Sequence, residues 1–490
     1  MELNSEVKER NDNNMEKKNT WETYSHKQLK EVDEFAKEYM QFLDMGKTER
    51  ECVDTIVNTI EKDGYKELQE IIKEKGKLKK GDKVYAVCMN KAIAMFRIGE
   101  KPMEEGMNIL GAHIDSPRLD VKQNPLYEEG GFAYLDTHYY GGVKKYQWVT
   151  IPLALHGVIV KKDGTTIELA VGENEDDPVF FISDLLIHLA QEQLEKKASK
   201  VIEGEALDLI IGNKPFLIDK KDKEEKKDKE EKGAAKEAVK KGILAILKEN
   251  YEIEEEDFIS AELEVVPAGK AREAGFDRSM ILAYGQDDRV CAFSSLKAML
   301  EVEESKRTAC CLLVDKEEIG SVGATGMQSR FFENTVAEVM NLLGQYSELA
   351  LRRCLTNSCM LSSDVSSAFD PSFASSFDKK NVAYLGGGMV FNKFTGSRGK
   401  SGSNDANAEY LAHLREIFDK ENINFQTAEL GKVDLGGGGT IAYILALYGM
   451  NVIDSGVAVL NMHAPWEATS KADVYETKRG YVAFLKGAKL

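Results

Sequence analysis

The residues of this chain that could do chemistry are two histidines and several acids, most of them placed just beyond an apolar, strand-like run. His113 and Asp115 follow such a run over residues 107–110. Four more candidate segments lie downstream. YGQDDRV places Asp287 and Asp288 ahead of a helix, and the other three follow strand-like runs: VDKEEIGS with Glu317 and Glu318, LSSDVSSAFDP with Asp364, and LNMHAPWE with His463. Ligands and catalytic groups gather at strand ends in α/β sheets. A lone His-x-Asp pair more often only satisfies loop backbone groups, so the recurrence of such residues is what indicates a site.

These residue types suit a site with two metal ions. Two imidazoles and several carboxylates make a mixed nitrogen and oxygen ligand set that fits zinc, manganese or cobalt. One carboxylate can bridge two ions about 3.5 Å apart, an arrangement that aminopeptidases use to polarise a carbonyl and activate a water. Glu317 and Glu318 are adjacent, and neighbours in an extended loop point in different directions. One of them can therefore bind metal while the other takes a proton from the water.

The composition excludes some classes of protein. The chain has 490 residues, a net charge of −18 and 42% hydrophobic residues, with a pI near 5.1. Nucleic-acid binding needs a basic footprint, which this charge does not provide. No apolar stretch is long enough for a membrane helix, and the N-terminal residues lack the apolar core of a signal peptide. We therefore expect a cytoplasmic enzyme with neither a nucleic acid nor a membrane as partner.

The cysteines point to a reducing compartment. There are seven of them, an odd number, and they lie mostly in apolar runs such as TACCLLV. This pattern predicts reduced, buried thiols instead of disulfide bonds. None of them has Cys-x-x-Cys spacing, so we do not expect a zinc site built from thiolates.

The elements that must position the candidate site begin with two helices. Apolar residues at helical spacing predict these helices over residues 26–42 and 49–75. Strand-like runs over residues 83–87 and 91–97 flank Asn90 and predict a hairpin. This hairpin leads the chain into the strand that precedes His113.

Beyond Asp120 the chain becomes rich in β structure. Strand-like runs cover residues 131–140, 149–160, 166–171 and 260–266, and residues 181–195 predict a helix that carries His188. Residues 219–232 are fourteen consecutive charged residues, seven acidic and seven basic. Such a run cannot bury a face, so we expect a solvated loop or frayed helix there, in preference to a docking segment.

From residue 271 onward, strands and helices alternate again. Strands are predicted at residues 308–314, 359–361, 382–384, 424–427 and 456–461, and helices at residues 292–302, 332–343, 404–420 and 440–447. This alternation indicates an α/β fold interrupted by a β-rich insertion. We expect a disordered N-terminus over residues 1–20, a catalytic domain made of residues 21–118 and 271–490, and an inserted domain over residues 119–270.

Five motifs together carry a resemblance to a known family. HIDSPRL, GQDDRVC, DKEEIGS, SSDVSSAFDP and NMHAPWE occur in this order. They resemble the motifs of the aspartyl aminopeptidase family of dinuclear zinc aminopeptidases, in particular its bacterial aminopeptidase 1-like members, and the resemblance runs from about residue 25 to the end. It implies a metal-dependent aminopeptidase that removes N-terminal residues from peptides. It also implies two divalent ions, zinc or else cobalt or manganese.

The resemblance implies a role for each candidate residue. His113 and Asp364 would hold one ion, Glu318 and His463 the other, and Asp287 would bridge them, with Glu317 as general base and acid and Asp115 as the carboxylate that orients His113. The motif favours Asp287 as the bridge, whereas the chemistry of the two aspartates leaves Asp288 equally open.

The resemblance also implies an architecture and an assembly. Family members have a three-layer α/β/α catalytic domain, interrupted by a dimerisation domain that matches the β-rich insertion. They form a homo-oligomer, a tetrahedral dodecamer built from dimers. In some members a histidine of the inserted domain reaches the active site of the partner, and His188 is the best match to it. An ordinary histidine on an amphipathic helix is an equally open interpretation.

The segments that would contact substrate depart from the family pattern. Members that select acidic N-terminal residues use a lysine in a Gly-Pro-Val-Ile-Lys-like segment, but GGGMVFNKF has Asn392 at that place, with Lys393 next to it. An amide removes the charge-assisted contact, so a neutral or hydrophobic preference is expected to compete with an acidic one. Gly437 and Gly438 precede a predicted helix whose amides could hold an anion. A turn that needs positive φ explains these glycines equally well.

Two other functions are compatible with the sequence. The same ligand set fits a different dinuclear hydrolase, either a carboxypeptidase or an amide deacylase. A non-catalytic shell protein on the same fold is the other alternative, although the chain keeps each expected ligand and Glu317.

Overall fold

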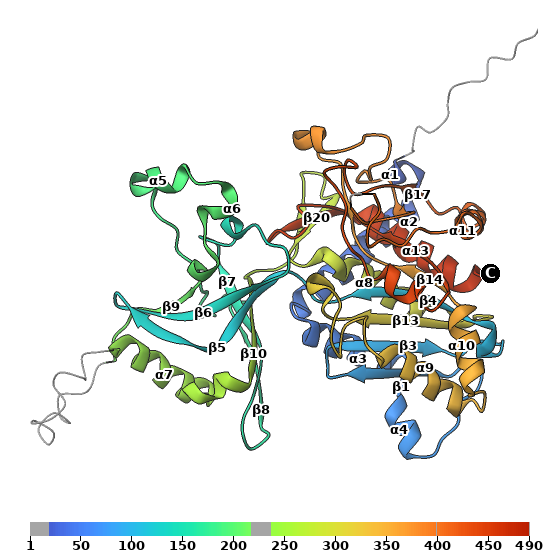
Figure 1. The fold of residues 1–490 in the computed structure, drawn as a ribbon, viewed down its shortest axis with the longest axis horizontal. Helices are drawn as coiled ribbons and strands as arrows, with labels where there is room; N and C mark the ends of the chain where they lie inside the picture. Colours follow the sequence, from blue (N-terminus) through green and yellow to red (C-terminus); the bar gives the residue numbers. More distant parts are fainter. Residues whose placement is uncertain (1–18, 217–236, 398, 490) are drawn as a thin grey trace, which may run out of the picture.

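The computed structural model describes residues 19–216, 237–397 and 399–489. Two lobes lie side by side in Figure 1, and the smaller one runs from β5 (Arg118–Glu129) to β10 (Ala261–Pro267). The charged run 219–232 and all but the last two residues of the predicted disordered segment 1–20 lie outside the described residues. Within the described part of the chain, no helix is long and apolar enough to cross a membrane.

A nine-stranded sheet forms the centre of the larger lobe. In spatial order its strands are β1 (Lys66–Glu67), β2 (Lys83–Cys88), β3 (Ala92–Arg97), β13 (Thr308–Val314), β4 (Met107–His113), β14 (Cys359–Ser362), β18 (Asn451–Gly456), β16 (Met389–Asn392) and β17 (Phe425–Thr427). The central strands β13, β4, β14 and β18 are parallel, whereas β3 and β16 run antiparallel to their central neighbours. The parallel strands therefore direct their carboxyl ends to one edge of the sheet.

The central strands are buried on both faces, as the unbroken apolar run of β13 predicts. Cys311 and Leu313 face one hydrophobic cluster, and their neighbours Cys310 and Leu312 face the other. Six of the seven cysteines are buried, as predicted.

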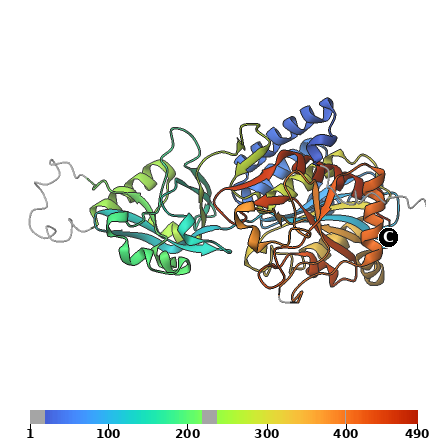
Figure 2. The ribbon, with the colours of Figure 1, turned by 90° about the horizontal axis from the view of Figure 1, so that it is seen from above.

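Helices cover both faces of this sheet. The first cluster is completed by α2 (His26–Met45), α3 (Glu49–Lys62), α8 (Gln286–Glu301), α11 (Ala408–Lys420) and α13 (Lys471–Gly487). The second is completed by α4 (Leu68–Lys73), α9 (Phe331–Leu342), α10 (Glu348–Thr356) and α12 (Ala442–Ala446). Figure 2 shows the blue N-terminal helices on one side of the larger lobe. A single short turn, α1 (Thr20–Thr23), precedes them.

The predicted helix over residues 49–75 is divided in two. Thr48 and Glu51 form a capping box that starts α3. Gly64 has a φ of +87°, a conformation that ends a helix and that glycine adopts without strain. The chain then forms β1 and the separate helix α4.

Two predicted strands differ from the structure. In the segment 382–384, Ala383 makes only a single bridge with Ala368. The segment 456–461 begins where β18 ends, at Gly456, and then forms β19 (Ala458–Leu460) in another sheet. A Cβ atom at Gly456 would lie 1.9 Å from the carbonyl oxygen of Asp364, so the close approach of these two segments requires glycine.

The smaller lobe is built on a six-stranded antiparallel sheet with its own hydrophobic cluster. Its spatial order is β8 (Thr166–Val171), β7 (Leu153–Val160), β10, β5, β6 (Phe132–Tyr140) and β9 (Leu209–Gly212), and α7 (Ala238–Tyr251) packs against it. The chain enters through β5 and leaves through its neighbour β10, where Glu264 pairs with Asp120. An inserted segment can leave the sheet of the larger lobe intact because its two ends lie together.

The predicted helix over residues 181–195 is wrong. This segment contains only η3 (Ile187–Leu189) and α5 (Gln191–Leu194), with no regular structure over residues 182–186. Leu186, Ile187 and Leu189 are each more than half exposed. Helices in proteins are stabilised mainly by packing of an apolar face, and these side chains remain largely unpacked within the described part of the chain.

A third, smaller sheet has five strands. Its strands, in spatial order, are β11 (Arg272–Ala274), β12 (Met280–Ala283), β20 (Glu467–Ser470), β19 and β15 (Ser366–Ser367). The other short elements are η1 (Met103–Glu105), η2 (Lys145–Gln147), α6 (Ala198–Val201), η4 (Gly204–Ala206), η6 (Glu255–Ser260), η7 (Glu317–Ile319) and η8 (Pro371–Ser376). Because β12 leads into α8 and β19 leads to His463, the third sheet carries two of the polar segments.

A buried histidine connects the two lobes. The Nδ1 atom of His156 in β7 lies 2.7 Å from Oε1 of Glu51 in α3, and its Nε2 atom lies 3.1 Å from Oε1 of Glu173. Burial lowers the pKa of His156, but the hydrogen bonds to Glu173 and Glu51 outweigh it and raise the pKa to about 8. The imidazolium form therefore stabilises the contact between lobes at neutral pH.

We expect the stabilising effect of His156 to disappear in alkaline solution. Its pKa is about 8 in the folded chain and about 6.5 in an unfolded chain, so the contribution of about 2 kcal/mol is complete below pH 6.5 and is lost as the pH rises through 8. In urea unfolding, the stability difference between wild type and His156→Gln should be larger at pH 6 than at pH 9. An equal difference at both values would contradict the assignment.

Candidate active site

The parallel strands of the large sheet bring predicted site residues to one edge. β4 ends at His113 and pairs in parallel with both β13 and β14. Glu317 and Glu318 follow β13 in η7, and Asp364 follows β14. Crossover connections of parallel strands leave ligand sites at their carboxyl ends, which is why these three loops meet.

Asp287 lies between the two histidines. Its Oδ1 atom is 3.3 Å from Nε2 of His113, and its Oδ2 atom is 3.3 Å from Nε2 of His463. Asp287 has non-helical backbone angles at the start of α8, where the chain arrives from the third sheet. A carboxylate that faces one imidazole with each oxygen can bridge two metal ions.

The other acids surround this aspartate. Three overlapping groups have ligand atoms within 4.8 Å of one another: His113, Asp287 and Glu318; His113, Glu317 and Asp364; and Asp287, Asp288 and Asp364. The Nε2 atom of His463 is 3.6 Å from Oε2 of Glu318. The structure therefore brings together the five residues that the motifs mark as ligands, along with Glu317.

The electrostatics of the site fit divalent cations. Burial and neighbouring carboxylates raise the pKa of Asp364 and of Glu318 well above the usual range. The Oε1 atom of Glu318 is buried and has no hydrogen-bond partner among the described residues. Crowded buried carboxylates are unfavourable unless a cation neutralises them. Donors limited to imidazole nitrogen and carboxylate oxygen suit zinc, cobalt or manganese.

Asp288 faces a different group from Asp287. Its Oδ2 atom accepts a hydrogen bond of 3.4 Å from the backbone N–H of His113. Burial raises the pKa of Asp288 well above its usual range. Asp288 thus contacts the backbone of one histidine, whereas Asp287 contacts the side chains of both.

Glu317 borders the same cluster from the side of the cavity. Its Oε2 atom lies 3.9 Å from Nε2 of His113. Burial, together with the nearby carboxylates of Asp115 and Asp287, raises the pKa of Glu317 to about 7. A carboxyl group with a pKa near neutrality can both accept and return a proton at physiological pH.

Asp115 contacts the ring of His113 and the loop that carries the paired glutamates. Nδ1 of His113 lies 3.0 Å from the backbone oxygen of Asp115 and 3.3 Å from its Oδ1 atom. The same carboxylate accepts the backbone N–H groups of Glu317 and Glu318, at 3.2 Å each. One buried acid therefore holds both a histidine ring and the loop that carries the paired glutamates.

Glu467 is a functional candidate that the sequence analysis missed. Its carboxylate accepts the backbone N–H of Asp287 at 3.0 Å and that of His463 at 2.7 Å. Burial raises the pKa of Glu467 to about 8. The signal in the sequence was its place at the end of the motif NMHAPWE. In the structure this acid starts the buried strand β20, and buried acids are rare unless they are paired.

A cavity of about 690 Å³ opens over the cluster. Asn392, Gly437 and Gly438 line it together with Glu317 and Asp364. The apolar part of its lining consists of Val365, Leu430, Tyr443, Met462 and Ala464.

Two predicted substrate contacts lie elsewhere in this chain. Lys393 is exposed and is not among the residues that line the cavity. His188 lies in η3 beside α5, on the smaller lobe (Figure 1), where it lines a different surface pocket with Leu185 and Leu189. Lys393 directly follows Asn392, the last residue of β16. Because consecutive residues of an extended chain point to opposite faces, Lys393 points away from the cavity that Asn392 lines.

The glycine segment is best explained by its backbone. Gly437 has a φ of +117°, and a Cβ atom there would lie 2.0 Å from the carbonyl oxygen of Gly396. The following helix α12 has only five residues and starts after Gly439. This segment therefore does not supply the helix N-terminal amides that the sequence predicted for binding an anion. Gly438 nevertheless lines the cavity.

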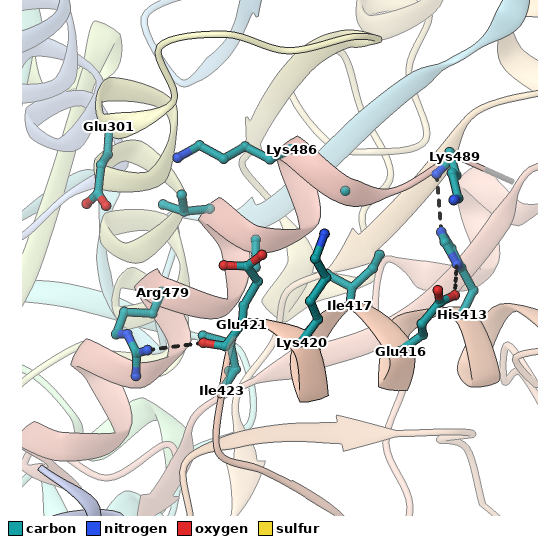
Figure 3. Close-up of a pocket in the computed structure, with 13 residues that line it drawn as sticks. Glu301, His413, Glu416, Ile417, Lys420, Glu421, Ile423, Arg479, Lys486 and Lys489 are labelled. Atoms are coloured by element: carbon teal, nitrogen blue, oxygen red, sulfur yellow. Dashed lines mark hydrogen bonds and ion pairs between the residues drawn. The ribbon is translucent and has the colours of Figure 1, made fainter.

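A second cavity, of about 380 Å³, lies between α11 and α13 (Figure 3). Its charged side chains are mixed in sign. Nδ1 of His413 is 3.5 Å from Oε2 of Glu416, and Arg479 donates to the backbone oxygen of Glu421. None of the predicted ligands lines this cavity, so the candidate chemistry belongs to the larger one.

Comparisons with known proteins match this chain to one family. Residues 42–485 match the family model described as aminopeptidase I zinc metalloprotease (M18). The probable M18 family aminopeptidase 1 of Clostridium acetobutylicum is 62% identical over 475 residues, covering 97% of this chain and 99% of the relative. The crystal structure of the M18 aminopeptidase of Thermotoga maritima superposes with a TM-score of 0.89 at 43% identity, covering 97% of this chain and 100% of that one.

A more distant structure shares the fold. The Saccharomyces cerevisiae mApe1 dodecamer superposes with a TM-score of 0.70 at 20% identity, covering 92% of this chain and 95% of that one. The match of the family model over most of the chain and the high identity to the clostridial relative agree with each other. This chain belongs to the M18 family of zinc metalloproteases and is an aminopeptidase.

Proposed function

We propose that the chain removes N-terminal residues from peptides at a centre of two divalent ions, with zinc as the first choice and cobalt or manganese as alternatives. The observation that carries this proposal is the placement of Asp287, whose two oxygens each lie 3.3 Å from a different histidine. His113 and Asp364 would hold one ion, Glu318 and His463 the other, and Asp287 would bridge them.

Two ions held there would polarise the scissile carbonyl and lower the pKa of a water. Glu317 takes the proton of the attacking water and delivers it to the nitrogen of the leaving amine. Its pKa of about 7 supports both halves of that transfer. Asp115 keeps the Nδ1 side of His113 occupied, so that Nε2 stays directed at the cluster.

The cavity supports a preference for neutral or hydrophobic N-terminal residues over acidic ones. Asn392 is buried at the end of β16, and Oγ of Ser366 donates to its Oδ1 atom at 3.4 Å. A neutral amide at this place cannot form the ion pair that would select an acidic side chain. Of the residues that line the cavity, Lys144 is the only lysine, and it is exposed to solvent, where such a contact is weak.

We also propose the organisation that the resemblance implies. Residues 21–118 and 271–490 would form a three-layer α/β/α catalytic domain, and residues 119–270 an inserted dimerisation domain. The exposed apolar side chains near His188 support a buried contact between copies. The mApe1 dodecamer supports an assembly of twelve chains. The resemblance implies a tetrahedral arrangement of dimers, in which His188 would reach the site of the partner subunit. Seven cysteines, six of them buried, support the cytoplasm as location.

The test is a panel of aminoacyl substrates, from Asp and Glu to Leu and Met, each with a free and with an acetylated amine. It is assayed with zinc, cobalt or manganese and after dialysis against a chelator. We expect hydrolysis of the free-amine substrates only, with Leu and Met ahead of Asp and Glu. Activity should be lost on chelation and restored by adding the ion back.

Each alternative predicts a different result in this panel. Hydrolysis of the acetylated substrates would indicate a carboxypeptidase or an amide deacylase. No turnover with any ion would indicate a non-catalytic shell protein, and full activity after chelation would refute the metal centre. Faster cleavage of Asp and Glu would refute the proposed preference.

A further inference from the structure

The inserted lobe contacts the candidate metal site directly, through the end of β6 and the turn that follows it. Tyr140 is the last residue of β6. Its hydroxyl donates a hydrogen bond of 2.9 Å to Oδ2 of Asp115, and both side chains are buried. Two residues later, the backbone oxygen of Gly142 lies 3.0 Å from Nδ1 of His463. One short segment of the insertion therefore contacts both the acid beside His113 and the ring of His463.

Through the carboxylate of Asp115, the hydrogen bond of Tyr140 affects one histidine ring and two backbone N–H groups. Asp115 lies against Nδ1 of His113 and accepts the backbone N–H groups of Glu317 and Glu318. A carboxylate with so many neighbours needs a fixed orientation, and the phenol supplies a donor to the oxygen that also accepts from Glu318. Loss of that donor would free the carboxylate to turn, and with it the ring and the loop that it holds.

The phenol is itself held in place by the junction of the lobes. The guanidinium of Arg118, at the start of β5, lies 3.9 Å from the centre of the Tyr140 ring. Arg118 in turn lies 3.1 Å from Glu264 of β10 and 3.5 Å from Glu49 of α3. Charged groups from both lobes thus fix the ring, so that its hydroxyl meets Asp115 in one position.

The contact of Gly142 orients the second histidine. When the Nδ1–H of an imidazole donates to a backbone carbonyl, its Nε2 atom keeps a free lone pair. In His463 that Nε2 atom is the one that faces Asp287 and Glu318. A Cβ atom at Gly142 would lie 3.3 Å from Nδ1 of His463, so the absence of a side chain allows the turn to approach the ring.

We infer that Tyr140 and the backbone of Gly142 are positioning groups of the metal centre, so that the inserted segment supports ion binding and turnover as well as assembly. The inference rests on the proposed two-metal function. It concerns only the residues of this chain that hold the ligands, and it can be tested by ion binding without any substrate.

The first experiment compares Tyr140→Phe with Tyr127→Phe in the full-length protein. Tyr127 of β5 is a matched control, because its hydroxyl donates to a carboxylate of the same lobe, Asp208, at 2.5 Å. Zinc affinity is measured by competition with a chromophoric chelator, and the ligand field by the absorption spectrum of the cobalt-substituted protein. The melting temperature of the metal-free protein and its size on a gel-filtration column serve as controls for folding and assembly.

We expect Tyr140→Phe to weaken zinc binding by about 10- to 100-fold and to alter the cobalt spectrum, as loss of an outer hydrogen-bond partner of a metal ligand does. Its kcat should fall by a similar factor while KM stays within about twofold, because the ligands move and the substrate cavity does not. Tyr127→Phe should retain wild-type affinity, spectrum and kcat. The inference would be overturned if Tyr140→Phe had the zinc affinity and the cobalt spectrum of the wild type. It would also be overturned if both variants lost the same amount of zinc affinity.

The second experiment tests Gly142. Gly142→Ala places a methyl group against His463, whereas Gly204→Ala, the control, places one 3.3 Å from the ring of Tyr139 in the same lobe. We expect Gly142→Ala to weaken binding of one ion, seen as a second, weaker phase in the titration, and Gly204→Ala to bind both ions as wild type does. A single tight phase for Gly142→Ala would refute this role. If wild type itself failed to bind two ions, the proposed function would fail instead, so the two failures are distinguishable.

Discussion

Glu317→Gln is expected to bind two ions per chain like the wild type and to lose at least about 100-fold, and up to about 10,000-fold, in kcat. Glutamine has nearly the same shape but cannot accept the proton of the attacking water, and general acid–base groups contribute rate factors of this size. Burial raises the pKa of Glu317 to about 7, so a neutral side chain at this place should not destabilise the metal-free protein. The measurements are kcat on a free-amine substrate and metal content by mass spectrometry.

The neighbouring residue is the informative comparison. Glu318→Gln changes the same atoms one position along the chain, but Oε2 of Glu318 faces Nε2 of His463 at 3.6 Å. We therefore expect this variant to lose affinity for an ion, and its activity to recover in part when excess metal is added. Glu348→Gln, whose side chain is 75% exposed on α10, should match the wild type. Wild-type turnover by Glu317→Gln would remove Glu317 from the mechanism.

Asp287→Asn is expected to abolish activity because neither ion is then held tightly. An amide offers one weak oxygen ligand and no charge, whereas the carboxylate has an oxygen directed at each histidine. Removing one member of a buried charge pair costs roughly 3–5 kcal/mol, so affinity should fall by at least about 100-fold. Chelator competition and metal content after desalting measure this loss.

Asp288→Asn distinguishes between the two adjacent aspartates. The Oδ2 atom of Asp288 accepts the backbone N–H of His113, and the oxygen of an asparagine can accept the same hydrogen bond. We expect Asp288→Asn to bind two ions and to retain measurable activity. The reverse result, with Asp288→Asn empty and Asp287→Asn loaded, would make Asp288 the bridge.

Much of the larger lobe could be predicted from local patterns. The runs that became β2, β3, β13 and β14 are short, apolar and bounded by polar residues, and a strand buried on both faces leaves this mark in sequence. The candidate ligands were equally visible, because each lies within a few residues of such a strand end. The local patterns did not predict β16 or most of β18, although both belong to the same sheet.

Other parts of the fold depended on contacts between residues that are far apart in the sequence. The helix expected around His188 does not form, because its apolar residues stay exposed and do not pack on the residues that the structure describes. The helix expected to reach residue 75 stops early at a glycine with positive φ. In both cases tertiary packing or backbone geometry outweighed the local periodicity that suggested a helix.

The types and order of the candidate metal ligands and of the candidate general base could be read from the sequence, because imidazoles and carboxylates recur there in the motifs of a known family. The groups that hold these ligands became visible only in the folded chain. Glu467 reaches back 180 residues to the backbone of Asp287, and Gly142 lies 321 residues before His463. No spacing rule encodes such pairs, since strand register and the docking of the inserted lobe bring them together.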